Sequence, residues 1–427
     1  MKPYSLSLLI IFIILFDNYT ITQEQTVKEN PFSQSKFVPD ISFIIDASYL
    51  YHNIKNHEFE ELQIPGISSL HSNATETHNH THITNQKGFN LNYGELYISA
   101  TADPFFDLTG ILHLSKSGLE IEEGYFVTRK LPLGFQLKGG KFYSGFGKIN
   151  EQHPHIWDFV EQPLIFNSFF GSEGLNETGV QLNWIAPTKF FLSTGVEVFQ
   201  GENEPSFGTQ GFSIGSNEIE AIEHPNLLTG FISTSLDIDD FTGLLKFSIA
   251  SGKKREVHTH YSETEHEENA ISAKTNIFGI SITGKYLIDP IKSLSFQTEY
   301  LYRTVKGNKY SYDSTAATVY DLERNQSGLY SQIVYKFAKR WRFGARYEFL
   351  ENNFLRLNNI SEKLPSYLPR YSAMIDFNPT EFSRIRFQYT YDRSRYLLED
   401  LNYSIKAIHQ ITLQINLSIG AHGAHPF

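Results

Sequence analysis

The chain alternates between apolar and polar residues over most of its length, and the stretch Phe382–Asp392 shows the pattern clearly. From Ile385 onward every second residue of this stretch is apolar or aromatic, and the residues between are polar or charged. Successive side chains of a β-strand point to opposite faces, so the pattern predicts a strand with one apolar and one polar face. Because the apolar face is rich in aromatic residues and the pattern returns along nearly the whole chain, we expect that face to meet lipid and the polar face to line water.

The repeated pattern predicts about sixteen strands with connections of two kinds. Short turns with Pro or Asp alternate with long polar loops, an asymmetry typical of outer-membrane barrels, which carry short periplasmic turns and long external loops. We therefore predict an all-β fold: a transmembrane antiparallel β-barrel over residues 40–419, in the outer membrane of a Gram-negative bacterium. The strands are expected at Ile41–His52, Asn90–Thr101, Phe105–Ser115, Ile121–Lys130, Gly134–Phe142, Thr178–Ile185, Lys189–Gln200, Leu227–Leu236, Phe241–Ser251, Thr275–Leu287, Ser293–Arg303, Gly328–Phe337, Arg340–Leu350, Arg370–Phe377, Phe382–Asp392 and Ser404–Ile419.

The two ends of the chain are expected to lie outside the barrel. Lys2 precedes the apolar run Leu8–Phe16, which has the length of a secretory h-region, so residues 1–25 are predicted to be a signal peptide with an uncertain cleavage site. Residues 26–39 and 420–427 are predicted to be periplasmic. A mean hydropathy of −0.30, without an internal apolar run of about 18 residues, excludes a helical membrane bundle. The chain has 0 Cys, which excludes disulfides and thiolate metal sites.

Extending the alternation identifies the charges that should face the lumen. The inner wall of the last strands is predicted to be net basic, although the formal net charge of the 427 residues is −11. Its channel-lining cations are Lys336, Arg340, Arg342, Arg346, Arg370, Arg384 and Arg386. The long segment 147–176 has the opposite balance, with Glu151, Asp158, Glu161 and Glu173. If that segment folds into the barrel, carboxylates would face guanidinium groups across a narrow aqueous gap and produce a transverse field that orients polar solutes. The alternative is that the arginines are solvated or paired on a wide lumen and have no role in selectivity.

Two stretches resemble known families. The run Glu122–Glu151, continued by Glu161–Leu164 and Gly174–Val180, resembles the phosphate-selective porin group. That resemblance implies that Lys148–Asn176 is a third loop that constricts the pore, and that the protein is a homotrimer. The ending Leu413–Phe427 resembles outer-membrane proteins labelled zinc-regulated TonB-dependent receptors. The chain is too short for a 22-stranded barrel with a plug domain, and its surface is acidic, so it departs from both groups.

Histidines gather in the predicted external loops. Those at i, i+2 spacing project from one face of an extended segment, so that two or three could share a Zn²⁺ or Cu²⁺ ion. The metal candidates are His71, His78, His80, His82, His153, His155, His258, His260 and His266. His153 and His155 lie on the predicted constriction loop, where a metal would sit in the transport path. The alternative is that these histidines are ordinary polar residues of solvated loops.

These features favour a passive channel for small hydrophilic solutes or ions that needs no cofactor. The alternative hypothesis is a zinc receptor that captures the metal with its external histidines. An outer-membrane enzyme would need a nucleophile or acid cluster with histidine at the rim, and His113 near Asp107 is the nearest arrangement, without a nucleophile pattern around it. We therefore predict no enzymatic activity. No phosphate-binding or nucleic-acid motif is present, and the predicted partners are the solutes, the outer-membrane lipids and other copies of the chain.

Overall fold

The fold was examined in a computed structural model, which describes residues 38–64, 66, 86–115, 118–261, 266–313, 316–362, 364–399 and 402–420. The predicted signal peptide and the tail after Gly420 lie outside the described residues. Within the described residues, no helix has both the length and the apolar character needed to span a membrane.

Seventeen described strands share one sheet, and sixteen of them form a closed antiparallel ring. The seventeenth, β16 (Ile360–Glu362), pairs only with the end of β15. The ring closes because β1 pairs with both β2 and β21. In ring order the strands are β1 (Asp40–His52), β2 (Gly88–Thr101), β3 (Phe106–Ser115), β4 (Gly118–Thr128), β5 (Phe135–Tyr143), β6 (Asn176–Ile185), β7 (Leu192–Phe199), β10 (Leu227–Ile238), β11 (Phe241–Tyr261), β12 (His266–Leu287), β13 (Ser293–Asp313), β14 (Ala317–Ala338), β15 (Trp341–Leu357), β17 (Leu368–Thr380), β18 (Ser383–Asp392) and β21 (Ile408–Gly420). The predicted barrel and its strand number are confirmed.

The barrel is apolar outside and polar inside, the reverse of a water-soluble sheet. On β21, Leu413 and Leu417 are 43% and 50% exposed, whereas Thr412 and Gln414 between the apolar positions are 2% and 4% exposed. Phe387 on β18 is likewise 47% exposed. The alternation in the sequence therefore separates an outer apolar face from an inner polar face, as the pattern predicted.

The strands are longer than expected on one side of the barrel. The stretches 252–261, 266–274 and 304–313 were expected to be loops, but they extend β11, β12 and β13 beyond the predicted strand ends. Their apolar residues, such as Ile271 and Val305, are few and do not alternate regularly with polar ones, so hydrophobic periodicity did not detect these extensions. The connection between β3 and β4 is also short, against the predicted alternation of turns and loops, because β4 begins at Gly118.

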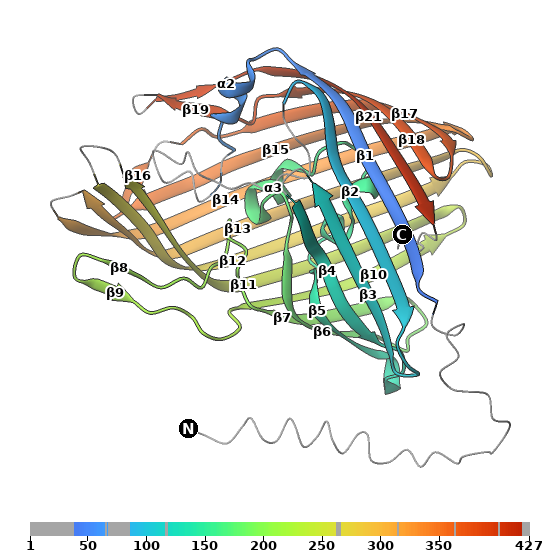
Figure 1. Ribbon diagram of the computed structural model, residues 1–427, viewed down its shortest axis with the longest axis horizontal. Coiled ribbons are helices and arrows are strands. Elements are labelled where there is room, and N and C mark those ends of the chain that lie inside the picture. The colour runs from blue at the N-terminus through green and yellow to red at the C-terminus, as the bar shows by residue number, and fades with distance from the viewer. Residues whose placement is uncertain are drawn as a thin grey trace. The chain divides into compact units, whose positions relative to one another are not determined.

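The remaining elements lie in the connections. Outside the ring sheet are two short hairpins, β8 (Phe212–Ile214) with β9 (Asn217–Ile219), and β19 (Tyr396–Glu399) with β20 (Asn402–Ile405). The helical turns are α2 (Asn56–Glu60), η3 (Pro132–Gly134), η4 (Ile149–Glu151), η5 (Pro154–Ile156) and α3 (Leu164–Phe170). Figure 1 shows α3 within the ring of strands, at a middle level of the barrel. The segment that carries η4, η5 and α3 is the predicted constriction loop.

Candidate functional site

The inserted segment, Ser144–Leu175, leaves the wall after β5 and returns to it at β6. Its two ends are held together, because the backbone N–H of Ser144 donates to the carbonyl of Leu175 at 2.9 Å. The side-chain amide of Asn150 strengthens this closure, because it donates to the backbone carbonyls of Ser144 and Leu175, at 2.9 and 3.0 Å. The segment therefore enters the barrel as a loop whose two ends are held together by hydrogen bonds. We call the place where Ser144 meets Leu175 the neck of the segment.

An apolar cluster fixes the segment to one side of the lumen. Phe166, Phe169 and Phe170 of α3 are 0–1% exposed, and they pack with wall residues that include Leu301 and Tyr330. A porin lumen would ordinarily be lined by polar side chains, so these inward apolar residues are departures from the alternation. They provide a dry contact between the segment and strands β11–β15.

Wall carboxylates bind the backbone of the segment. Glu197 on β7 accepts from the N–H of Gly145 at 2.8 Å, and Glu348 on β15 accepts from the N–H of Leu164 at 2.8 Å. Glu299 on β13 accepts from the N–H groups of Lys148 and Ile149 at 2.7 and 2.9 Å. All three glutamates are fully buried. Hydrogen bonds from N–H groups to a carboxylate are charge-assisted, so this buried set holds the path of the segment firmly.

Positively charged side chains also bind the segment. We call these side chains, which lie on β15, β17 and β18, the basic wall: Arg342, Arg346, Arg370, Arg384 and Arg386. Arg342 forms an ion pair with Asp158 at 2.8 Å. The other four donate to backbone carbonyls of His155, Trp157, Glu161 and Gln162, at 2.6–3.2 Å. Glu348 and Asp376, both 0% exposed, neutralise part of this wall. All five arginines contact the inserted segment, and their role as channel-lining residues stays a prediction.

The predicted aqueous gap between the segment and these arginines is absent, because the two are in direct contact. Glu161 lies 3.9 Å from Arg346. Glu151 instead pairs with Lys246 on β11 at 2.9 Å, and Glu173 is half-buried beside a small pocket near the neck. A guanidinium group buried without a partner would be costly, so the segment docks and supplies acceptors for the buried wall.

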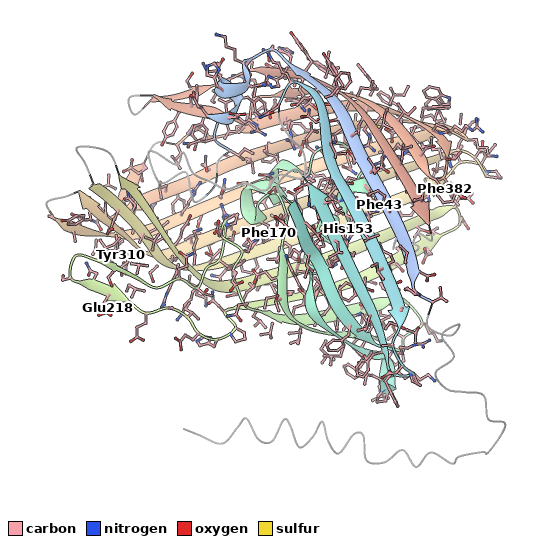
Figure 2. The ribbon with its side chains drawn as sticks, in the orientation of Figure 1. Phe43, His153, Phe170, Glu218, Tyr310 and Phe382 are labelled. Atoms are coloured by element: carbon pink, nitrogen blue, oxygen red, sulfur yellow. The ribbon has the colours of Figure 1, made fainter. Side chains whose placement is uncertain are left out.

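The acidic wall, Glu95 on β2 with Glu122 and Glu123 on β4, lies on another side of the same segment. These carboxylates are 2–6% exposed and face His153 and His155. His155 Nδ1 lies 3.2 Å from Glu95, and His153 Nε2 lies 2.9 Å from Glu123. Burial alone would lower the pKa of His153, but Glu122 and Glu95 raise it well above its ordinary value. Figure 2 labels His153 at the middle level of the barrel.

A large cavity lies between the segment and the short turns. It has a volume of about 1470 Å³ and is bordered by residues of the turns after β14 and β17 and by residues near the ends of β10, β11, β12 and β13. Its cationic lining comprises Lys148, Lys285, Lys336, Lys339, Arg340, Arg342 and Arg384, against the carboxylates of Asp158 and Glu381. Lys336 and Arg340 were predicted to line a channel, and they line this cavity. Among the described residues, neither contacts a carboxylate of the inserted segment.

The other predicted site residues have different outcomes. His71, His78, His80 and His82 lie outside the described residues. His258, His260 and His266 stand on the paired ends of β11 and β12, and only their backbone is described. Asp107 forms an ion pair with Arg129 at 3.6 Å, whereas His113 packs beside Tyr93, so the two residues considered for an enzyme are not a pair. Sequence reasoning missed the acidic wall, although Glu122 and Glu123 stand side by side in the sequence.

Solved structures with the same fold define the class of the protein. OmpT of Vibrio cholerae aligns with a TM-score of 0.52 at 9% identity, over 92% of this chain and 100% of the other. The outer membrane channel DcaP of Acinetobacter baumannii aligns with a TM-score of 0.51 at 11% identity, over 91% and 99%. The anion-selective porin of Comamonas acidovorans aligns at 0.50 and 8% identity, over 90% and 100%. The fold is thus that of the outer-membrane β-barrels of Gram-negative bacteria, in their sixteen-stranded porin form.

A relative in sequence places the chain more narrowly. An uncharacterized protein of Aquifex aeolicus is 46% identical over 399 residues, which covers 93% of this chain and 82% of the relative. The chain therefore belongs to the same family as that Aquifex protein. No family model matches the sequence.

Proposed function

We propose that the protein is a porin-like channel for small hydrophilic solutes and that it favours anions. The observation that carries this proposal is the cavity of about 1470 Å³, with seven cationic side chains and two carboxylates in its lining. A cleft lined by one sign of charge between low-dielectric walls concentrates ions of the other sign. The cavity is basic in a chain whose formal net charge is −11, so its charge is local and does not follow from composition.

The inserted segment would set the permeability. It contacts strands on several sides of the lumen through the apolar cluster, the basic wall and the acidic wall. Sixteen-stranded barrels leave an aqueous channel when nothing fills them. We therefore expect ions to pass beside the segment through a narrow route, with a small unitary conductance.

Planar-bilayer recordings of the purified protein test this proposal. Discrete conductance steps are expected, and a KCl gradient should give a reversal potential of the sign that anion preference requires. Exchanging Lys336 and Arg340 for Glu should shift that potential toward cations, because both line the cavity. Lys189→Glu is the matched control, since Lys189 is an exposed turn residue that does not line the cavity. The absence of steps, or the same shift with both changes, would contradict the proposal.

The outer surface and the assembly complete the proposal. The exposed apolar residues of the strands, such as Phe387 and Leu413, are suited to contact outer-membrane lipids. We expect a homotrimer, and a trimer form is described for the fold neighbour OmpT of Vibrio cholerae. Cross-linking in native outer membranes should give a trimer band that disappears on heating in detergent.

A further inference from the structure

The acidic wall and the inserted segment bring together the side chains of a metal site. The Nδ1 atom of His153 lies 3.6 Å from Oε2 of Glu95 and 3.5 Å from Oε1 of Glu122. His155 Nδ1 lies 3.2 Å from the same Oε2 of Glu95. Glu95, Glu122 and His153 each offer one ligand atom, and the three atoms lie within 4.8 Å of one another.

These separations match tetrahedral coordination better than they match hydrogen bonds. Zinc bonds of 2.0–2.2 Å to nitrogen and oxygen place neighbouring ligand atoms about 3.3–3.5 Å apart in a tetrahedron. A good N–H···O hydrogen bond is about 2.9 Å long. His153 Nδ1 is buried and makes no hydrogen bond among the described residues. The nitrogen is thus directed between two carboxylate oxygens at the spacing that a shared ion requires.

Neighbouring groups orient these ligands as they do in metalloproteins. The other nitrogen of His153, Nε2, lies 2.9 Å from Oε2 of Glu123, the carboxylate–histidine arrangement that fixes the ring of a metal-bound imidazole. Tyr143 supports both carboxylates: its hydroxyl donates to Glu122 at 2.8 Å, and its backbone N–H donates to Glu123 at 2.9 Å. The site is therefore built by β2, β4, β5 and the inserted segment together.

The three carboxylates of this site outnumber its two imidazoles, so a protonated His153 offsets only part of their charge. Three carboxylates that are 2%, 6% and 4% exposed face two imidazoles, and an imidazole that binds metal is neutral. Buried charges in proteins are paired or coordinate a metal. A divalent cation would replace the proton of His153 and would neutralise more of this charge than that proton does.

We infer that Glu95, Glu122 and His153 form a binding site for a divalent transition-metal ion of the Zn²⁺ class, with Glu123 as the residue that positions His153, and with His155 beside Glu95. Imidazole nitrogen combined with carboxylate oxygen suits zinc and its neighbours, and the chain has 0 Cys to offer a softer site. His155 lines the large cavity, so the site borders the proposed permeation route. The inference does not require conduction, since the ligands are placed by the fold alone.

Calorimetric titration of the full-length protein with Zn²⁺ tests the inference. The titration should use a background in which His78, His80 and His82 are changed to Ala, because that tract can bind zinc independently. One site is expected in this background, and His153→Gln should abolish it. With Co²⁺ as the probe, the background protein should show the intense visible absorption of a tetrahedral ion, and His153→Gln should lose it.

Two further variants separate loss of the site from loss of the fold. Glu123→Gln keeps all three ligands, so zinc affinity should fall by about 10–100-fold without being abolished, as for other residues that orient a metal ligand. His224→Gln, a change of an exposed loop histidine, should leave zinc binding unchanged. Retention of the barrel is checked by heat-dependent mobility on a gel. A folded His153→Gln variant that still binds one zinc, or a folded background protein that binds none, would show that these histidines form only ion pairs with the wall and would overturn the inference.

Discussion

The basic wall and the acidic wall hold the same inserted segment, but they do so in different ways. At the basic wall, arginines donate to backbone carbonyls, and the buried Glu348 and Asp376 bind further guanidinium nitrogens. At the acidic wall, carboxylates meet histidine side chains, and the distances to His153 Nδ1 exceed those of good hydrogen bonds. Each arginine of the basic wall thus has a protein oxygen at hydrogen-bond distance, although one nitrogen each of Arg342, Arg346 and Arg384 is buried without a hydrogen bond among the described residues, whereas the acidic wall has the composition and spacing of a ligand set.

The difference indicates a division of roles along the segment. Arginine is always charged and its planar group binds several acceptors at once, so it suits a permanent anchor. Histidine and glutamate change their charge or their partner when a proton or metal is present, so they suit a regulated contact. The basic wall would then fix the segment, and the acidic wall would respond to the medium.

Removing the segment should have the largest effect and should abolish both contacts at once. Replacing residues 147–172 by a short Gly-Ser linker is feasible because the neck is already closed by the Ser144–Leu175 hydrogen bond. Unitary conductance in planar bilayers should rise severalfold, since the lumen of a sixteen-stranded barrel would be open. Zinc binding at the acidic wall should be lost. A folded variant with unchanged conductance would show that the segment does not limit permeation.

Breaking the basic wall should destabilise the barrel strongly. In Arg370→Gln, the fully buried Glu348 loses two charge-assisted bonds, of 2.7 and 2.9 Å, and the carbonyl of Gln162 loses its donor. Removing one partner of a buried ion pair costs about 3–5 kcal/mol. Urea-induced unfolding in detergent micelles measures the loss in the free energy of unfolding.

Arg393→Gln provides the matched control for this measurement, because Arg393 lies one residue beyond β18 and is exposed. Its change should stay within about 0.5 kcal/mol, as for surface substitutions elsewhere. An equal loss in the free energy of unfolding of both variants would show that the buried Arg370 contributes no more than an exposed arginine does.

The sequence predicted the barrel better than it predicted the site. Period-two alternation is a local signal, so strands such as β3 and β18 could be identified within one residue at each end. The extensions of β11, β12 and β13 escaped detection, because their few apolar residues do not alternate regularly with polar ones. The inward direction of Arg346 and Arg386 followed from the same alternation.

The acidic wall could not be predicted, because it depends on contacts distant in the sequence. His153 was singled out for its spacing to His155, yet its partners Glu95 and Glu122 come from strands 58 and 31 residues earlier (153 − 95 and 153 − 122). Glu122 and Glu123 also adjoin an irregularity in the pairing of β3 with β4, between Ile111 and Leu112, where Glu123 pairs with Ile111 and Ile121 with Leu112. Such a bulge changes which side chains face inward, and simple alternation does not reveal it.

Zinc should stabilise the protein through the acidic wall. At a free concentration of one hundred times the dissociation constant, a ligand that binds only the folded state adds about 2.7 kcal/mol to the free energy of unfolding. We expect this gain in the protein whose external His78, His80 and His82 are changed to Ala, and its loss after Glu122→Gln. Glu218→Gln is the matched control and should keep the gain, because Glu218 is an exposed residue of β9, in the hairpin of β8 and β9. An equal response to zinc in the Glu122 and Glu218 variants would contradict a role for the acidic wall.

The smallest effect is expected for an ion pair of the same length outside the lumen. Lys306 on β13 and Glu323 on β14 approach to 2.7 Å, the distance between Arg370 and Glu348, but their side chains are 67% and 32% exposed. Exposed pairs contribute about 0.2–1 kcal/mol, because water solvates each charge nearly as well as its partner does. Lys306→Gln should therefore lower the free energy of unfolding by less than about 1 kcal/mol, and 1 M salt should remove the difference from wild type. A loss as large as that of Arg370→Gln would mean that the distance between the paired groups, and not their burial, decides how much an ion pair contributes to the free energy of unfolding.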